Sequence, residues 1–104
     1  MTTIGRKSGK TYENALIFGL DSENPVVVAS YGGRPDHPDW YKNLVANPRV
    51  KVQILADRFD AIARTASPEE KQRLWPMMVG YYPLYDDYEA RTDRDIPVVI
   101  LQRA

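Results

Sequence analysis

A run of hydrogen-bond donors near the start of the chain and a group of tyrosines near its end are the side chains best suited to chemistry. The donors lie in Gly5–Lys10, a glycine-containing turn in which basic and hydroxyl side chains can surround an anion. The tyrosines are Tyr82, Tyr85 and Tyr88, whose hydroxyls can donate a proton or hydrogen-bond a developing oxyanion. Because the chain has no redox side chain of its own, electron chemistry would require a bound cofactor.

The composition argues against several classes of function. Fourteen basic and fourteen acidic residues cancel within 104 residues, so no net field attracts nucleic acid. The absence of cysteine and the single histidine, His37, argue against a zinc or haem site built by the protein. The adjacent carboxylates Asp86 and Asp87 are interpreted as a solvated helix face. No apolar run spans a bilayer and no leader is visible, so we expect a cytoplasmic protein with one domain over residues 1–104.

The basic turn resembles a P-loop only at its end. Gly9, Lys10 and Thr11 fit the pattern, but Ile4 stands where the first glycine is required. A P-loop must also continue into a helix, whereas Tyr12–Leu20 is strand-like in composition. We therefore reject a nucleotide triphosphatase. Two interpretations of the turn remain, a binding site for phosphate or carboxylate and a solvated basic hairpin.

The stretch Ser30–Pro48 joins an apolar strand, a glycine pair and a short aromatic helix. Pro38 suits the first helical turn and Asp39 places negative charge at the positive end of the helix dipole. The spacing predicts that Trp40, Tyr41, Leu44 and Val45 share one helix face, and that the helix ends before Pro48. The stretch is either a ligand shelf or an ordinary crossover connection.

The remaining segments predict a mainly β, α+β fold. The polar, turn-like segment Asp21–Pro25 predicts a hairpin that joins the strand Tyr12–Leu20 to a strand at Pro25–Ser30. Further strands are expected at Val50–Leu55 with Asp57–Thr65, and at Ile96–Leu101. Ser67 and Glu70 form a capping box for a helix that Pro76 should kink or break, and a second helix follows Pro83 with Tyr81, Tyr85 and Tyr88 on one face. No regular βαβ repeat is present, so we expect a small barrel of about six mostly antiparallel strands with short peripheral helices.

Several motifs together resemble the deazaflavin-dependent nitroreductase family, which includes F420H2-dependent quinone reductases. They are Thr2-Thr-x-Gly-Arg-Lys-Ser-Gly9, Val27-Val-Ala-Ser-x-Gly-Gly33, His37-Pro-x-Trp-Tyr-x-Asn-Leu-x-Ala-Asn-Pro48, Leu74-Trp-Pro76, Tyr82-Pro-x-Tyr-x-x-Tyr88 and Arg91-Thr-Asp-Arg-x-Ile-Pro-Val-Val99. The resemblance implies a split β-barrel like that of FMN-binding oxidoreductases. It also implies coenzyme F420, an 8-hydroxy-5-deazaflavin with an anionic tail, which gives a hydride to a quinone-like or, in some members, a nitroaromatic acceptor.

The resemblance also implies roles for particular residues. The phosphate and tail would meet Arg6, Lys7 and Ser8. The deazaflavin would lie among residues of three further segments, which are Asn14, Ala15, Leu16, Val28, Ala29, Ser30, Tyr31, Trp40, Tyr41 and Asn43. The acceptor would face Tyr82, Tyr85 and Tyr88, one of which orients it or donates a proton.

Two departures from the family pattern are expected to matter. Thr11-Tyr12 replaces a common Pro-Arg pair, which removes one tail-binding charge, and Tyr31 replaces a Lys or Asn, which alters the acceptor pocket. The segment before the first strand is shorter than in some relatives, which weakens the expectation of peripheral membrane association. The alternatives are an FMN-binding split-barrel oxidoreductase and a non-enzymatic deazaflavin-binding protein. A homodimer that pairs through its sheets is compatible with the aromatic content.

Overall fold

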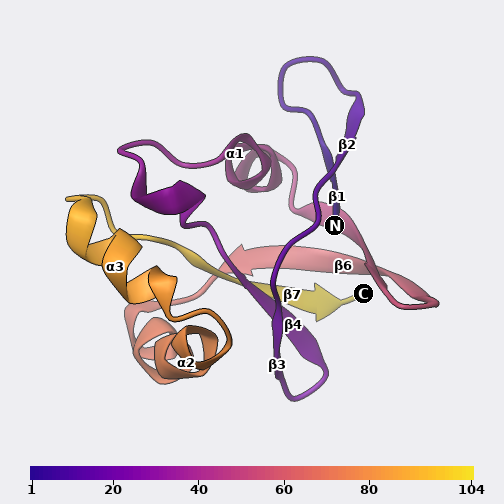
Figure 1. The fold of residues 1–104 in the computed structure, drawn as a ribbon. Coiled ribbons are helices and arrows are strands. Elements are labelled where there is room, and N and C mark those ends of the chain that lie inside the picture. Colours follow the sequence, from indigo (N-terminus) through magenta and orange to yellow (C-terminus); the bar gives the residue numbers. More distant parts are fainter.

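The computed structural model describes residues 1–104 and contains one antiparallel sheet of seven strands (Figure 1). The strand order is β2-β1-β5-β6-β7-β4-β3. The strands are β1 (Thr2–Ile4), β2 (Thr11–Glu13), β3 (Gly19–Asp21), β4 (Asn24–Val28), β5 (Arg49–Ile54), β6 (Asp57–Thr65) and β7 (Val98–Arg103). The expected hairpins form between β3 and β4 and between β5 and β6.

The sheet differs from the prediction in strand number and closure. The stretch Tyr12–Leu20, predicted as one strand, contributes to two strands, β2 and β3. The pairing of β2 with β1 ends where Glu13 lies opposite Thr2, because β1 begins at Thr2. Residues 14–18 then cross without regular structure to β3 at the other edge of the sheet. Since β2 and β3 do not pair with each other, the sheet is not closed into a barrel.

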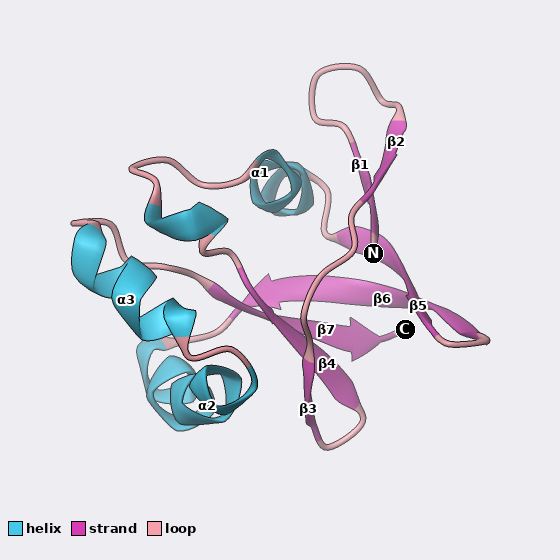
Figure 2. Cartoon of the chain, viewed as in Figure 1, coloured by secondary structure: helices cyan, strands magenta, loops and turns pink.

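The core lies on both faces of the neighbouring strands β4 and β7. Val27 and Val99 belong to a cluster under α1 (Asp39–Ala46), whereas their neighbours Val26 and Val98 belong to a cluster under the other two helices. Successive side chains of a strand point to opposite faces, so both strands are apolar without alternation. Figure 2 shows the result, with α1 on one side of the strands and α2 (Pro68–Tyr81) and α3 (Leu84–Arg91) on the other. None of these helices is long and apolar enough to cross a bilayer.

The first helix buries a different face from the one predicted. Trp40 and Leu44 are buried as expected, but Val45 is 61 % exposed and Tyr41 is only partly buried. Asn43, at 5 % exposure, takes the remaining inward position. A helix face is continued by residues three and four positions apart, which from Trp40 are Asn43 and Leu44. The sequence pattern favoured apolar residues and therefore missed a polar one that faces inward.

The second helix confirms the predicted start and, of the kink or break predicted at Pro76, excludes the break. The Ser67 side chain accepts a hydrogen bond from the Glu70 N–H, and the Glu70 carboxylate accepts one from the Ser67 N–H. The helix nevertheless continues through Pro76 to Tyr81. Leu74 and Met78, on either side of the proline, are 2 % and 0 % exposed, so packing of both flanking turns holds the helix together across the missing hydrogen bond.

Ion pairs fix the two late helices to each other and to the sheet. Arg73 of α2 makes two hydrogen bonds to the carboxylate of Asp21 in β3, at 2.9 and 3.0 Å. The Lys71 ammonium donates to Glu89 of α3 and to Asp95, both at 2.7 Å. These contacts hold α3, which carries two of the three predicted tyrosines, in a defined place against the fold.

The capping box makes stability depend on pH in the acid range. Arg64, and next the Ser67 N–H, lower the pKa of Glu70 from 4.5 to about 2. A lowered folded-state pKa adds stability above the unfolded value, and this stability is lost as the pH falls from about 4.5 towards 2. We expect Glu70→Gln to be less stable than the wild type at neutral pH and the two to converge in acid. Urea unfolding across this range measures the difference. Glu69→Gln, which removes no ion pair, should follow the wild type throughout.

Candidate functional site

Two adjoining cavities form one groove beside the start of α1. The first, the polar arm, has a volume of about 680 Å³ and the second, the aromatic arm, of about 340 Å³. Tyr31, Pro38 and Trp40 line both arms, so the arms meet at these residues. The groove therefore offers a charged end and an aromatic end to one elongated ligand.

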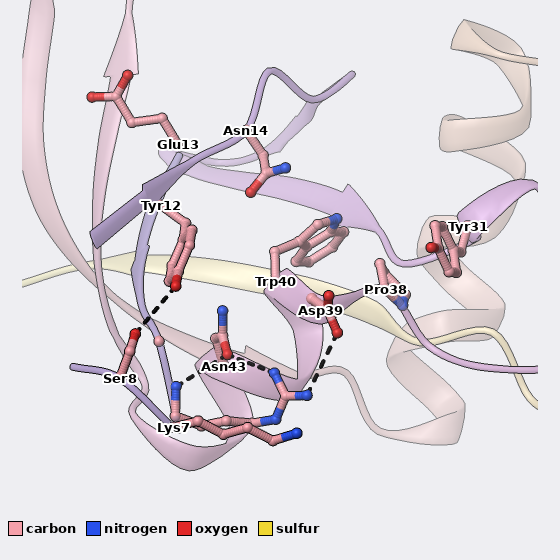
Figure 3. Close-up of a pocket in the computed structure, with 12 residues that line it drawn as sticks. Lys7, Ser8, Tyr12, Glu13, Asn14, Tyr31, Pro38, Asp39, Trp40 and Asn43 are labelled. Atoms are coloured by element: carbon pink, nitrogen blue, oxygen red, sulfur yellow. Dashed lines mark hydrogen bonds and ion pairs between the residues drawn. The ribbon is translucent and has the colours of Figure 1, made fainter. Parts of the chain in front are cut away.

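The polar arm is built by the turn between β1 and β2 and by the start of α1 (Figure 3). The Arg6 N–H and Nη1 donate to Asn43 Oδ1 at 3.2 and 2.8 Å, and Nη2 lies 3.5 Å from Asp39 Oδ1. These contacts tie the turn to the helix, so Arg6 is held at the cavity wall. Lys7 lines the same arm and makes no ion pair or hydrogen bond through its side chain. The cations of this arm are Arg6 and Lys7, and Arg6 is paired with Asp39, so Lys7 is the one cation of the arm without a partner inside the chain.

Tyr12 completes the polar arm in the place where the family pattern implies arginine. Its hydroxyl lies 3.1 Å from Ser8 Oγ, which also accepts the Lys10 N–H at 3.2 Å. A Cβ on Gly5 would lie 2.6 Å from the Tyr12 ring, so the glycine allows that ring to cover the turn. The lost charge is thus replaced by a hydroxyl and an aromatic wall.

The turn between the two arms has an unusual backbone. Tyr31, Gly32 and Gly33 have φ angles of 49°, 64° and 76°, three left-handed residues in succession. The Arg34 guanidinium lies 4.8 Å from the centre of the Tyr31 ring, and its Nη1 donates to the Tyr31 hydroxyl at 3.3 Å. The left-handed backbone of Tyr31 is unfavourable in conformational free energy, and it places the residue at the junction of the arms. Such strain is typical of residues at functional sites.

Substitution of Gly33 should separate steric contact from backbone strain. A Cβ there would lie 2.9 Å from the Tyr88 carbonyl oxygen, whereas a Cβ on Gly32 would meet nothing within 4 Å. We expect Gly32→Ala to cost about 1–2 kcal/mol, the left-handed penalty alone. Gly33→Ala should cost at least about 1 kcal/mol more, because α3 must shift to admit the methyl group. Urea unfolding of both variants checks this, and equal losses would contradict the close approach.

Tyr82, Tyr85 and Tyr88 converge in the aromatic arm. The hydroxyls of Tyr82 and Tyr88 lie 3.2 Å apart, and their hydrogen bond raises the pKa of Tyr82. Tyr85 is 5 % exposed, with its ring centre 5.0 Å from that of Tyr82. Burial raises the pKa of Tyr85, and its hydroxyl makes no hydrogen bond within the chain. Of the three, Tyr85 is therefore the tyrosine whose hydroxyl has no hydrogen-bond partner within the chain.

The structure corrects the predicted tyrosine face. Tyr81 is the last residue of α2 and is 61 % exposed, so it does not join Tyr85 and Tyr88. The chain leaves the helix at Tyr82, whose extended backbone turns its side chain towards α3 instead. The break before Pro83 therefore replaces Tyr81 by Tyr82 in the cluster.

Most of the predicted site residues line the groove, and two do not. Those that line it are Arg6, Lys7, Ser8, Asn14, Ala15, Leu16, Val28, Ser30, Tyr31, Trp40, Asn43, Tyr82, Tyr85 and Tyr88. Ala29 is fully buried in the core, because alternation along the strand directs it away from the groove. Tyr41 bonds to Thr65 Oγ1 at 2.8 Å and packs against the ring of His37.

Sequence reasoning missed some lining residues. Glu13 was assigned only to a strand, and Asp39 only to a helix end, although both line the polar arm. Ile17 adds an apolar contact to the aromatic arm. The signal that could have found Glu13 is its position shortly after the basic turn, where a strand must run beside the same cavity.

The fold and the groove together define a class of protein. A basic turn at one end and clustered tyrosines at the other suit a flat cofactor with an anionic tail, as in flavin-type oxidoreductases. The model of the F420H(2)-dependent quinone reductase family matches residues 1–103, and the chain belongs to that family.

Individual relatives agree with this assignment. The chain is 36% identical over 104 residues to the F420H(2)-dependent quinone reductase Rv1261c of Mycobacterium tuberculosis, covering 97% of this chain and 70% of that protein. It is 43% identical over 97 residues to Rv3178 of the same organism, covering 93% of this chain and 82% of that protein, whose name provisionally assigns the same activity.

Solved structures show the same fold. A structure of an F420-H2 dependent reductase, FDR-A, superposes with a TM-score of 0.89 at 42% identity, covering 97% of this chain and 90% of that one. A structure described as a domain-swapped dimer gives the same TM-score and identity and covers 97% of this chain and 76% of that one.

Proposed function

We propose that this protein is an F420H2-dependent reductase that passes a hydride from reduced deazaflavin to a quinone. The observation that carries the proposal is the continuity of the groove, whose polar and aromatic arms meet at Tyr31, Pro38 and Trp40 in a chain of this family. When bound, the coenzyme supplies the hydride, which the side chains of the chain cannot provide.

The residues of the polar arm fit the anionic tail of the coenzyme. Lys7 has no partner inside the chain, and Arg6 is held at the wall by Asn43. Guanidinium and ammonium groups bind phosphate and carboxylate through charge-assisted hydrogen bonds. Ser8 and Asn14 add neutral donors at the same end of the groove. The tail would therefore be bound mainly by charge, and its affinity should fall as salt rises.

The aromatic arm fits the ring and the acceptor. Val28 and Ser30 offer small groups along one wall, and Trp40 offers a flat face. Tyr85 would donate its hydrogen bond to the acceptor oxygen, where negative charge develops as the hydride arrives. Its hydroxyl is protonated at neutral pH, because the ordinary pKa of a tyrosine is 10.0 and burial raises it further. The quinone gains a hydride and a proton in total, and Tyr85 stands where it can give or relay that proton.

We extend the proposal to nitroaromatic acceptors and to the shape of the sheet. A nitro group offers oxygen acceptors as a quinone does, although the ring of Tyr31 takes up space where the aromatic arm meets the polar arm. A flat sheet of seven strands is about 29 Å wide, whereas the residues 14–18 that join its edges reach about 22 Å at most. The sheet must therefore curl, which supports a split β-barrel opened between β2 and β3.

We also propose that two copies associate into a homodimer. A similar structure is described as a domain-swapped dimer, and both edge strands of this sheet lack a partner. Sedimentation velocity at several protein concentrations would measure the assembly.

The function is tested by binding and turnover with matched cofactors. Isothermal titration should give a dissociation constant for F420 at least about tenfold lower than for FMN, since FMN lacks the long anionic tail. Mixing the protein with F420H2 and a soluble naphthoquinone should restore the absorbance of oxidised F420. A preference for FMN would contradict the cofactor, and F420 binding without turnover across a panel of quinones would favour a binding protein.

A further inference from the structure

Arg94 makes a set of contacts that is unusual for a charged side chain. Its Nε donates to the Arg34 carbonyl at 2.9 Å, Nη1 donates to the Ala29 carbonyl at 3.1 Å, and Nη2 donates to the Ser30 carbonyl. Nη1 also lies 3.0 Å from His37 Nδ1. No carboxylate is close enough to form an ion pair with Arg94, so backbone carbonyls and a ring nitrogen take up its donors. An arginine whose donors bond to backbone carbonyls fixes the conformation of the chain segment that carries those carbonyls.

The three carbonyls lie at both ends of the left-handed turn. Ala29 and Ser30 precede Tyr31, and Arg34 follows Gly33. Left-handed backbone is costly for a tyrosine, and two glycines give the free turn many competing conformations. The turn itself contributes two internal hydrogen bonds, from the Gly33 and Arg34 N–H groups at 3.0 and 3.2 Å. The guanidinium adds three bonds that exist only when both ends of the turn are correctly placed.

We propose that Arg94 is a positioning residue that holds the Ser30–Arg34 turn in the shape that lines both arms of the groove. The guanidinium does not line the groove, so it acts through the turn and not on a ligand. It places Tyr31 at the junction and Ser30 in the aromatic arm before a ligand arrives. The identity of that ligand as a deazaflavin rests on the proposed function, whereas the preorganised turn does not.

His37 makes the same clamp sensitive to acid. A guanidinium only donates hydrogen bonds, so His37 Nδ1 must be the acceptor and the imidazole must be neutral. Protonation would place a donor and a positive charge against Arg94. The other charged groups around His37 are largely committed elsewhere, with Asp36 bonded to Lys42 at 2.6 Å and Asp95 bonded to Lys71 at 2.7 Å. The ring of Tyr41, 4.9 Å away, offers no charge at neutral pH. Burial, and next the Arg94 charge, lower the pKa of His37.

Amide hydrogen exchange on the ligand-free protein tests the clamp. The Gly33 and Arg34 amides report on the turn, and the amides of the β5–β6 hairpin serve as an internal reference. In Arg94→Gln the turn amides should exchange at least about tenfold faster while the hairpin is unchanged, as expected for local opening. Arg94→Lys should fall between, and Arg91→Gln, an exposed arginine without contacts, should match the wild type. Unchanged turn amides, or equal acceleration everywhere, would overturn the proposal.

A second variant tests the clamp if Arg94→Gln does not fold. His37→Gln keeps an acceptor for Arg94 but cannot titrate. After correction for the intrinsic effect of pH on exchange, protection of the wild-type turn should fall between about pH 7 and about pH 5. The turn of His37→Gln should stay protected over the same range. Equal pH profiles for the two proteins would overturn the link between His37 and the clamp.

Titration with F420 separates this inference from the proposed function. Arg94→Gln should raise the dissociation constant of F420 about tenfold, because the turn must be ordered at the expense of binding. A faster-exchanging turn with unchanged F420 affinity would overturn the role of the clamp in the groove. Failure of the wild type itself to bind F420 would overturn the proposed function, and the exchange data would still decide the role of Arg94.

Discussion

Tyr85→Phe is expected to lower kcat for quinone reduction about 10²–10³-fold, the usual cost of removing one donor to a developing oxyanion. The reason is that Tyr85 carries a protonated hydroxyl with no partner in the chain, inside the aromatic arm. The ring is retained, so packing and F420 affinity should hardly change. Stopped-flow oxidation of F420H2, together with an F420 titration, measures both quantities.

Two further tyrosines make this test specific. Tyr81→Phe removes a hydroxyl from the neighbouring helix end that does not reach the groove, and it should leave kcat unchanged. Tyr82→Phe breaks the pair with Tyr88 and should have a smaller effect than Tyr85→Phe, because Tyr88 keeps its own hydroxyl. If Tyr85→Phe retained the full rate, the assignment of the donor to Tyr85 would be wrong.

The double variant Arg6→Ala with Lys7→Ala is expected to weaken F420 binding by about 2–4 kcal/mol, or about 30-fold to 1000-fold. The lower end applies if Arg6 keeps most of its bonding to Asn43 in the complex, since those bonds already use part of its donors. The loss should shrink as salt is raised, because the lost contacts are charged and partly exposed. Isothermal titration at two salt concentrations gives both results.

The single variants divide this effect between binding and folding. Arg6→Ala removes the Nη1 donor to the buried Asn43 oxygen but keeps the backbone N–H donor, and it should also lower the free energy of unfolding by about 0.5–1.5 kcal/mol. Lys7→Ala removes a side chain without partners and should weaken binding while stability is kept. Lys10→Ala removes the same charge from the same turn but outside the groove, and should have the smallest effect on affinity. Equal losses for Lys7→Ala and Lys10→Ala would indicate only a diffuse positive field.

Local signals predicted most of the fold. The capping box of Ser67 and Glu70, the hairpin after Asp21 and the apolar runs of β4 and β7 each depend on a few neighbouring residues, and the structure confirms all three. The outcomes at Pro76 and Asn43 do not depend on neighbouring residues alone. Whether a proline breaks a helix, or a polar residue faces inward, depends on what packs around it from elsewhere in the chain, and local sequence does not contain that information.

Only part of the groove was predicted, because some of its features also depend on contacts between distant parts of the chain. The basic turn and the tyrosines were found because their residue types are unusual, and the cavities bring both to one groove. Ala29 was placed in the site by its neighbours, yet strand alternation turns it into the core. Arg94 was quoted only as part of a motif. Its role depends on carbonyls 60 to 65 residues away in sequence, and backbone carbonyls leave no trace in residue types.

The contact between Gly33 and the backbone of Tyr88 limits how this protein can acquire new acceptors. Because the turn that lines the junction of the two arms closely approaches the main chain of α3, repositioning that helix to admit a bulkier acceptor should alter both arms of the groove. Directed evolution should therefore find its gains by trimming side chains such as Tyr31 and Tyr88. Loop insertions ahead of α3, which would displace that helix, should be counter-selected here.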